Sequence, residues 1–388
     1  DRQQVAEHAD FLGRISRYTS PAPHDKSLVK TKRPKRLLKR ILRSVRKVLR
    51  QGGRATGVFQ TGATTPRPSV FQNGDVYISV GSAWDDNDLG QLLERKQHDG
   101  IKVLSMCYDM IPIKFPHLTV PQFKGLFPRY IANVARVADH VLCISKCTQA
   151  DFIEATRAMQ CPTPETSVIR LGSDLPQAAA HAAGASQDEA NLSIEVANAA
   201  ASPFVLFVST IERRKNHETL YKAWVRLIET GRPIPNLVCV GSRGWGVDDL
   251  LSDLARDPRI RGRIHVLHAV SDAELTMLYK RCLYTVYPSL YEGWGLPVVE
   301  SFGFGKFCLC SNTGSLPEAG GDLAEYLDPW DLNAWIARIQ FFADHPNEVE
   351  CRNRRVAESF HHHSWHKTSH AIMLKARALA RKGPPPEA

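Results

Sequence analysis

The chain has 388 residues, of which 43% are hydrophobic, and its formal net charge is +10. This length predicts two domains, and the apolar content is enough for two substantial cores. No run approaches the ~20 apolar residues that span a bilayer, and nine cysteines without CxxC spacing disfavour a disulfide framework. The chain opens with the polar stretch DRQQVAEHAD, which is unlike a signal peptide, so we expect a cytoplasmic protein.

The first region, residues 1–73, is predicted to hold helices, a basic segment and a loop. Within it, KTKRPKRLLKRILRSVRKVLR (residues 30–50) carries eleven Lys or Arg, and its aliphatic residues recur at helical spacing. Such a basic amphipathic helix suits the surface of an anionic membrane, which would make the protein peripheral on the inner face of the cell membrane. It equally suits packing on the protein itself with the charges in water. Nucleic acid is not expected to bind, because the segment lacks aromatic residues for base stacking.

Short β-rich runs alternate with helical segments from residue 74 onward. This alternation predicts a parallel sheet covered by helices on both faces, so residues 74–176 are expected to form a Rossmann-like domain. The predicted strands are VYISV, GIKVLSM, HVLCIS and SVIRL.

An Ala-rich segment, residues 177–202, is predicted to be an interdomain linker or a surface insertion that has room for short helices, and a second alternating series follows it. Residues 203–355 are therefore expected to form a second Rossmann-like domain, and residues 356–388 a C-terminal helix and tail. Two doubly wound α/β domains would then face each other across a cleft, with ligands at the carboxyl ends of the strands. The predicted strands of the second domain are FVLFVS, NLVCVGS, IHVLHAV, TVYPS and FCLCS.

The segment YPSLYEGWGLPVVESFG (residues 287–303) combines a predicted strand end, a glycine-rich turn and a helix start. Pro297 suits the first turn of a helix, whose free backbone N–H groups would point into the cleft as a seat for phosphate. Glu292 and Glu300 flank this seat. Because two carboxylates would repel a phosphate, we expect them to address sugar hydroxyls on either side.

A cationic cluster lies in FVSTIERRKNHETL (residues 207–220), directly after another predicted strand. Arg213, Arg214 and Lys215 would face the same cleft and could neutralise a diphosphate without a metal ion. The alternative is an ordinary solvated charge cluster on a loop.

Taken together, the two segments resemble the retaining, nucleotide-sugar-dependent glycosyltransferases of GT-B fold, family 4, also described as glycosyl transferases group 1. VSTIERRKN and YPSLYEGWGLPVVE are similar to segments of bacterial enzymes, mannosyltransferases among them, that make surface polysaccharides. The resemblance covers roughly residues 74–375. It implies transfer of a hexose, with mannose as the first guess, from a GDP- or UDP-sugar to a glycan or lipid-linked acceptor. O-antigen-type biosynthesis would be the setting, and neither a metal nor another cofactor is expected.

The resemblance also assigns roles by position. It implies catalytic roles for Glu292, which would face the transferred sugar, for Lys215, which would hold the diphosphate, and for Asp109, on the acceptor side. Glu300 would bind the ribose, and the loop at residues 269–275 would flank the base. The other implied donor-binding residues are Arg214, Gly293, Trp294, Gly295, Leu296, Pro297, Val298, Val270 and Leu275.

The chain departs from the family pattern at several positions. Tyr108 stands where many relatives have His, Arg213 replaces a proline, and Thr210 replaces a basic residue. Relatives begin with a strand and a Gly-containing loop that have no counterpart before residue 74, so we expect the first βα unit to be absent or to belong to sequence outside this chain. This leaves two alternatives: another enzyme on the same architecture, and a truncated, non-catalytic module that binds nucleotide, membrane or a partner.

Overall fold

The computed structural model describes residues 70–81, 89–173 and 192–381. All described residues from Phe71 onward belong to one compact unit. The basic segment and the rest of the expected N-terminal region up to residue 69 therefore lie outside the described residues, as does most of the Ala-rich segment. None of the described helices is long and apolar enough to cross a bilayer.

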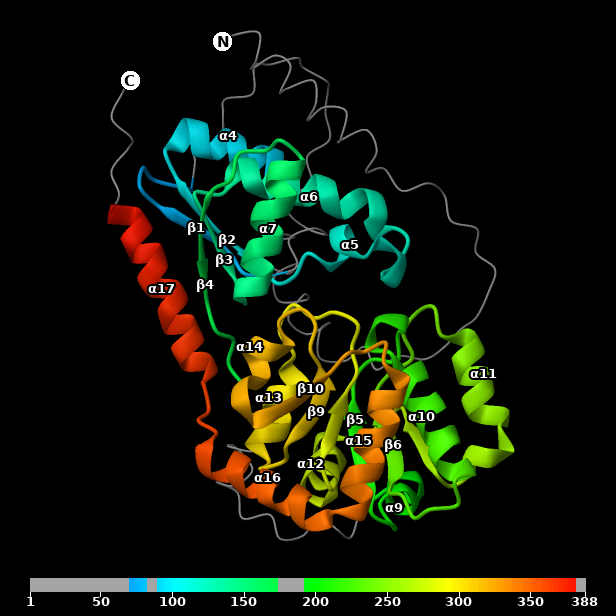
Figure 1. Cartoon of the computed structure of the whole chain (residues 1–388). Coiled ribbons are helices and arrows are strands. Elements are labelled where there is room, and N and C mark those ends of the chain that lie inside the picture. The colour runs from blue at the N-terminus through cyan, green and yellow to red at the C-terminus, as the bar shows by residue number, and fades with distance from the viewer. Residues whose placement is uncertain (1–69, 82–88, 174–191, 382–388) are drawn as a thin grey trace, which may run out of the picture. The chain divides into compact units, whose positions relative to one another are not determined.

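The first domain is built on a parallel sheet whose four described strands have the order β1-β2-β3-β4 (Figure 1). The strands are β1 (Val76–Ser79), β2 (Lys102–Cys107), β3 (His140–Cys143) and β4 (Glu165–Val168). The helices are α4 (Leu89–Asp99), α5 (Ile111–Lys114), α6 (Phe123–Val137) and α7 (Lys146–Ala158), with a 3₁₀ turn at Pro116–Leu118. Side chains of α4 and α6 pack on the sheet to form its core, as the strand–helix alternation predicts.

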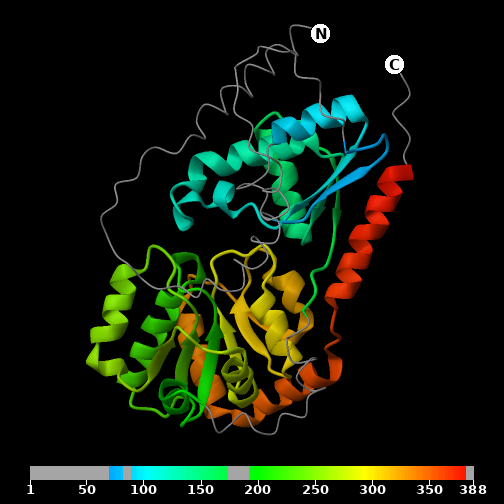
Figure 2. The same cartoon turned by 180° about the vertical axis from the view of Figure 1, so that it is seen from behind.

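The second domain holds a six-stranded parallel sheet in the order β10-β9-β8-β5-β6-β7 (Figure 2). Its strands are β5 (Phe204–Val208), β6 (Asn236–Val240), β7 (Ile264–Leu267), β8 (Thr285–Tyr287), β9 (Cys308–Ser311) and β10 (Ala324–Leu327). Its helices are α9 (Ile194–Ala199), α10 (His217–Glu229), α11 (Asp248–Arg256), α12 (Asp272–Arg281), α13 (Leu296–Gly303), α14 (Leu316–Gly320), α15 (Leu332–Asp344) and α16 (Pro346–Ser359), with 3₁₀ turns at Arg213–Lys215, Pro258–Ile260 and Gly321–Leu323.

Two structural details differ from the sequence-based expectation for this domain. Strand β10 extends the sheet beyond the strands predicted. Helix α9 is a short helix of the kind allowed for in the segment predicted as a linker or surface insertion, but its Val196 and Ala199 are buried with strand residues such as Leu206. Residues 192–202 therefore belong to the second domain, because their small apolar side chains cover part of its sheet.

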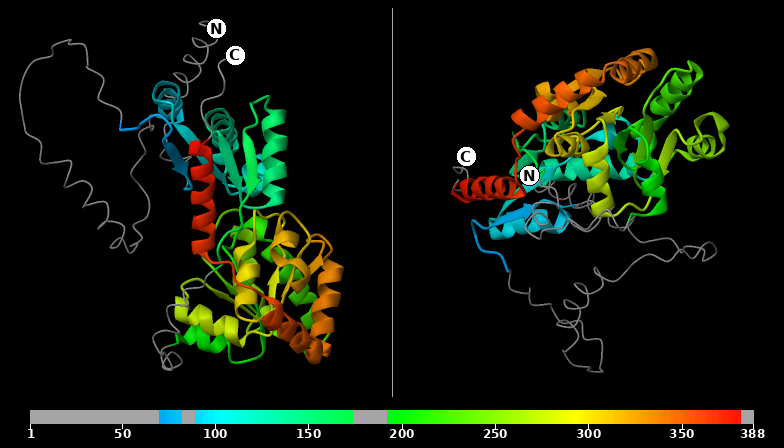
Figure 3. Two further views of the ribbon diagram at one scale, coloured as in Figure 1. Left: turned by 90° about the vertical axis from the view of Figure 1, so that its left-hand side faces the viewer. Right: turned by 90° about the horizontal axis from the view of Figure 1, so that it is seen from below.

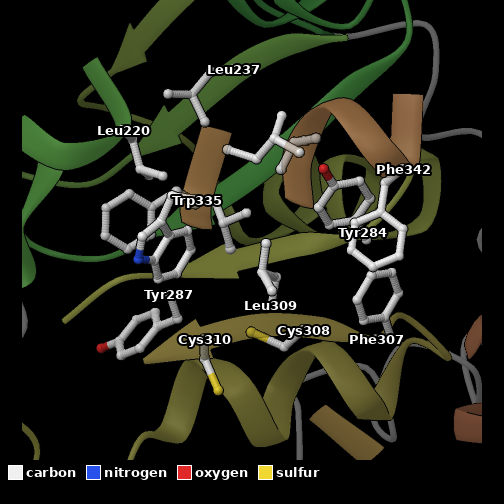
Figure 4. Close-up of a cluster of buried hydrophobic side chains, with 14 of the residues drawn as sticks. Leu220, Leu237, Tyr284, Tyr287, Phe307, Cys308, Leu309, Cys310, Trp335 and Phe342 are labelled. Atoms are coloured by element: carbon white, nitrogen blue, oxygen red, sulfur yellow. The ribbon is translucent and has the colours of Figure 1, made fainter. Parts of the chain in front are cut away.

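Aromatic side chains pack together in the core of the second domain (Figure 4). Trp335 is fully buried, and its indole N–H donates to the backbone oxygen of Asp328 at 2.9 Å. The ring of Tyr284 stacks on Phe307 with centroids 5.0 Å apart and also contacts Phe342. Burial of each such ring contributes about 1.5–3 kcal/mol to the stability of the fold, so this core stabilises the strands whose ends carry the loops of the site.

The last described helix, α17 (Trp365–Arg381), packs on β1 and β2 of the first domain (Figure 3). Its Ala376 and Leu379 join a cluster with Leu104, and the hydroxyl of Thr368 donates to the backbone oxygen of Arg170 at 2.9 Å. The C-terminal segment thus returns from the second domain and completes the cover of the first.

Candidate active site

The second sheet has its reversal of strand order between β5 and β8. In open parallel sheets, ligands bind outside the carboxyl ends of the strands that flank such a reversal. The loop after β5 carries Arg214 and Lys215, and the loop after β8 carries Glu292. The order of the strands therefore brings the cationic segment and the glutamate-containing turn together at the same edge of the sheet.

Backbone contacts fix the two loops to each other. Asn216 adopts the left-handed conformation with φ of 61°, and its side-chain amide donates to the backbone oxygens of Pro288 at 3.1 Å and Pro329 at 3.0 Å. The backbone N–H of Leu290 donates to the oxygen of Arg214 at 2.8 Å. Asn tolerates this conformation better than most residues, which explains its place directly after the cations.

A buried charge cluster forms where the loops meet. The Nζ atom of Lys215 lies 2.5 Å from Oε1 of Glu292, and a guanidinium nitrogen of Arg214 lies 2.7 Å from Oε2. The hydroxyls of Ser289 and Tyr287 donate to Oε1 at 2.7 Å and 3.1 Å. Both oxygens of the carboxylate are therefore used inside the protein, and Glu292 orients two cations.

Charge compensation sets the ionisation of this cluster. Burial would raise the pKa of Glu292, but Lys215 and Arg214 outweigh burial and lower that pKa to about 2. Burial lowers the pKa of Lys215 below its ordinary value, although Glu292 acts in the opposite direction. A second carboxylate, Glu212, accepts from Arg214 at 2.7 Å, and burial raises its pKa. The positive charge of Lys215 thus depends on the carboxylate that holds it.

Asp109 reaches the site from the first domain, after β2. Its Oδ1 accepts from the backbone N–H of Ile111 at 3.0 Å, which fixes the carboxylate at the start of α5. Burial raises the pKa of Asp109, while Arg214 and Lys215 act to lower it. Asp109 and the charge cluster therefore share one electrostatic environment.

Gly293 brings the glycine-rich turn against the first domain. A Cβ atom at this position would lie 2.3 Å from the backbone oxygen of Tyr108 and 2.8 Å from the Cβ of Asp109. The backbone oxygen of Gly293 also accepts from the Thr148 hydroxyl at 3.2 Å. We expected a glycine here for the approach of a ligand, and the structure adds a direct reason: the backbones of the two domains meet at this residue.

The rest of the turn leads into α13 as predicted. Gly295 has a φ of 115° at the N-cap, a conformation suited to glycine, and Pro297 lies in the first turn of the helix. The side chains of Trp294 and Val298 are buried, so only their backbones can face a ligand, while Leu296 and Pro297 are half-buried.

The remaining predicted donor residues lie on α13 and at the start of α12. Glu300 is half-buried on α13, its carboxylate accepts from the Tyr279 hydroxyl at 3.4 Å, and burial raises its pKa. Val270 and Leu275 pack partly buried against the core of the second domain. Ser271 and Glu274 form a capping box, which fixes the start of α12 between Val270 and Leu275.

A set of contacts between the domains was not predicted from the sequence. The Tyr291 hydroxyl donates to the carboxylate of Asp151, which also pairs with Lys114, and lies 3.0 Å from the Sγ atom of Cys147. The carboxylate of Glu318 accepts from two backbone N–H groups at the start of α7, at 2.8 Å and 2.7 Å. The sequence offered one hint of a role for Tyr291, its position next to Glu292. It could not indicate the partner, because Asp151 is 140 residues away in the chain.

Comparison with solved structures defines the fold. The chain is similar to sucrose-phosphate synthase from Thermosynechococcus elongatus, with a TM-score of 0.53 and 22% identity over 74% of this chain and 70% of that one. It is also similar to Anabaena HepE, solved in complex with UDP and glucose, with a TM-score of 0.55 and 16% identity over 78% of each chain. The chain has the GT-B fold. The charge cluster, Asp109 and Gly293 all lie where the two GT-B domains meet.

Sequence comparison agrees with this fold. Residues 189–354 match the family model of glycosyl transferases group 1. The chain is 29% identical to the serotype-specific mannosyltransferase WbdA of Escherichia coli over 240 residues, 60% of this chain and 29% of that protein. It is 41% identical to the O-antigen chain mannosyltransferase B of Escherichia coli over 137 residues, 35% of each. The GT-B chain thus spans about three tenths of the length of WbdA.

Proposed function

We propose that this protein is a retaining glycosyltransferase of family 4 that moves a hexose from a nucleotide sugar to a glycan or lipid-linked acceptor. Mannose from GDP-mannose is the first candidate, because the named relatives are mannosyltransferases. The setting is assembly of a bacterial surface polysaccharide of O-antigen type. The observation that carries this proposal is the buried cluster of Lys215, Arg214 and Glu292 beside the start of α13, opposite Asp109.

The two cations are suited to a diphosphate. Lys215 and Arg214 have side chains only 12% and 14% exposed, so they would act on the leaving group with little screening by water. The N-terminus of α13 adds backbone N–H groups on the same side. Glu292 holds both cations in place, and we assign it a positioning role in addition to contacts with the transferred sugar.

The reaction that fits these groups is a front-face transfer. The bond between the anomeric carbon and the diphosphate oxygen breaks as the acceptor oxygen bonds to the same face of that carbon. The acceptor proton passes to the departing diphosphate oxygen. Lys215 and Arg214 stabilise the charge that develops on this leaving group, while Asp109 orients the acceptor hydroxyl. Glu300 would bind the ribose hydroxyls, with Val270 and Leu275 near the base.

The test is a thermal-shift panel with GDP, UDP, ADP, dTDP and their common sugar conjugates. A ligand at a hundred times its dissociation constant should stabilise the fold by ~2.7 kcal/mol. One nucleotide series should raise the Tm, Glu300→Ala should abolish that rise, and Glu358→Ala, an exposed glutamate on α16, should retain it. If no nucleotide raises the Tm, the proposed function is wrong.

Turnover of the donor that binds separates an enzyme from a non-catalytic module. We expect transfer that persists in EDTA and falls by a few orders of magnitude in Lys215→Ala. Loss of activity in EDTA with recovery in Mg²⁺ would contradict the role given to Lys215. Binding of nucleotide without cleavage, with mixed glycan acceptors present, would favour the non-catalytic module.

A further inference from the structure

An apolar cavity of about 180 Å³ lies beside Asp109. One face of α6 forms much of its wall, through Phe127, Tyr130, Ile131 and Val134 at helical spacing. Two predicted site residues, Asp109 and Arg214, line its mouth, but the roles assigned so far leave its apolar interior unused.

The cavity has a polar end and an apolar interior. Asp109 and Arg214 line it at the charge cluster. Two other polar groups of its wall are used within the protein: the Trp245 indole N–H donates to the oxygen of Leu118 at 3.2 Å, and the Thr119 hydroxyl donates to a backbone oxygen at 3.3 Å. A ligand that extends inward from Asp109 therefore meets hydrocarbon and aromatic surface, where an unpaired hydroxyl would be costly.

We infer that this cavity binds an apolar group of the acceptor, a hydrocarbon of about six carbon atoms joined to the sugar whose hydroxyl lies at Asp109. The inference rests on the proposed function, since it uses Asp109 as the acceptor end of the site. The size follows from volume, because a cavity of about 150 Å³ is known to hold a benzene ring. The chemistry of the group could come from an isoprenoid or from a straight alkyl chain.

The experiment measures dissociation constants of alkyl α-mannosides and α-glucosides by calorimetry, with the nucleoside diphosphate present and below micelle-forming concentrations. The chains run from methyl through butyl and hexyl to dodecyl. Burial of one CH₂ group corresponds to about a fourfold gain in affinity, so affinity should rise about fourfold per carbon and level off near six carbons. Tighter binding of a prenyl than of a pentyl glycoside, at five carbons each, would assign an isoprenoid, and the reverse a straight chain.

Filling the cavity should remove this dependence on chain length. Val134→Phe adds bulk inside the cavity, and Thr119→Phe narrows it from a half-buried position if the first variant fails to fold. Leu126→Phe is the matched control, because Leu126 lies on the same helix and is 42% exposed. Both filled variants should bind hexyl and methyl glycosides equally, whereas the control should keep the difference.

Two results would overturn the inference. One is equal affinity for methyl and hexyl glycosides in the unmodified protein. The other is affinity that keeps rising to dodecyl and is unchanged in the filled variants, as for non-specific adsorption. Failure of the proposed function is distinguishable from both, because it would appear as no Tm rise with any nucleotide sugar, whatever the acceptor.

Discussion

Glu292→Gln tests whether this carboxylate is the electrostatic anchor of the site. The change keeps the shape of the side chain but removes the negative charge that faces Lys215 at 2.5 Å and Arg214 at 2.7 Å. Removal of one partner from a buried ion pair typically costs 3–5 kcal/mol, because the other charge stays buried and uncompensated. The drop in the pKa of Glu292 from 4.5 to about 2 on folding corresponds to about 3 kcal/mol, which agrees in size.

Urea and thermal unfolding at pH 7 should therefore show a loss of about 3 kcal/mol, which for the unit of residues 71–388 corresponds to roughly 4–5 °C in Tm. The loss has a defined pH dependence. The folded pKa lies below the unfolded one, so the stabilisation by Glu292 is complete above about pH 4.5 and disappears as the pH falls towards 2. The variant and the unmodified protein should accordingly converge in stability in acid.

Two further variants make the test specific. Glu292→Gln combined with Lys215→Met removes the stranded cation as well, and should be at least about 2 kcal/mol more stable than Glu292→Gln alone. Glu218→Gln removes a carboxylate that pairs with Lys222 at 2.6 Å, but both side chains are more than half exposed, so its cost should be only about 0.3–0.5 kcal/mol. Equal losses for Glu292→Gln and Glu218→Gln would refute the reasoning, as would a double variant no more stable than the single one.

Three other predictions concern burial, domain contact and helix capping. Burial lowers the pKa of His217 to about 3, so between pH 6.5 and 3 the unfolded chain binds a proton that the folded chain excludes. The free energy of unfolding should therefore decrease as the pH is lowered from 6.5 to 3. The urea midpoint of His217→Phe should decrease less over the same range. Gly293→Ala places a Cβ 2.3 Å from a backbone oxygen of the first domain, so transfer should fall at least about tenfold, whereas Gly125→Ala, with open space around its Cβ, should leave transfer unchanged. Glu318→Gln removes a charged acceptor from two N–H groups of α7 and should cost about 1 kcal/mol, with faster hydrogen exchange of those amides; unchanged exchange would count against the contact.

The fold was predictable where strands are buried on both faces. Phe204–Val208 and Leu237–Val240 are continuous apolar runs in the sequence and lie in interior strands of the sheet, as buried parallel strands require. Ala324–Leu327 escaped prediction because it is an edge strand, half-buried throughout, and has no such run. The packing of α9 on the second domain was not predicted for a related reason: small residues in an Ala-rich stretch give the same composition whether they cover a sheet or form a linker.

The site was predictable as far as topology determines it. Lys215 and Glu292 follow strands on either side of the reversal in strand order, so their contact follows from the order of elements. The bond between Tyr291 and Asp151 has no such basis, because it joins different domains and depends on how two separate sheets pack. Gly293 lies between these cases: the sequence marks a glycine for close approach but cannot say whether a ligand or another backbone approaches it.

The two glutamates of the motif differ in environment, which agrees with the separate roles proposed for them. Glu292 accepts from two cations and two hydroxyls, so its pKa falls and it is a permanent anion. Glu300 has a single hydroxyl contact at 3.4 Å, and burial raises its pKa. A carboxylate with satisfied oxygens is suited to hold charge in place, whereas one with remaining acceptor capacity is suited to bind the hydroxyls of a ligand. The eight-residue spacing puts the first glutamate on the loop beside the cations and the second on the helix, so one short segment supplies both an electrostatic anchor and a candidate sugar-binding group.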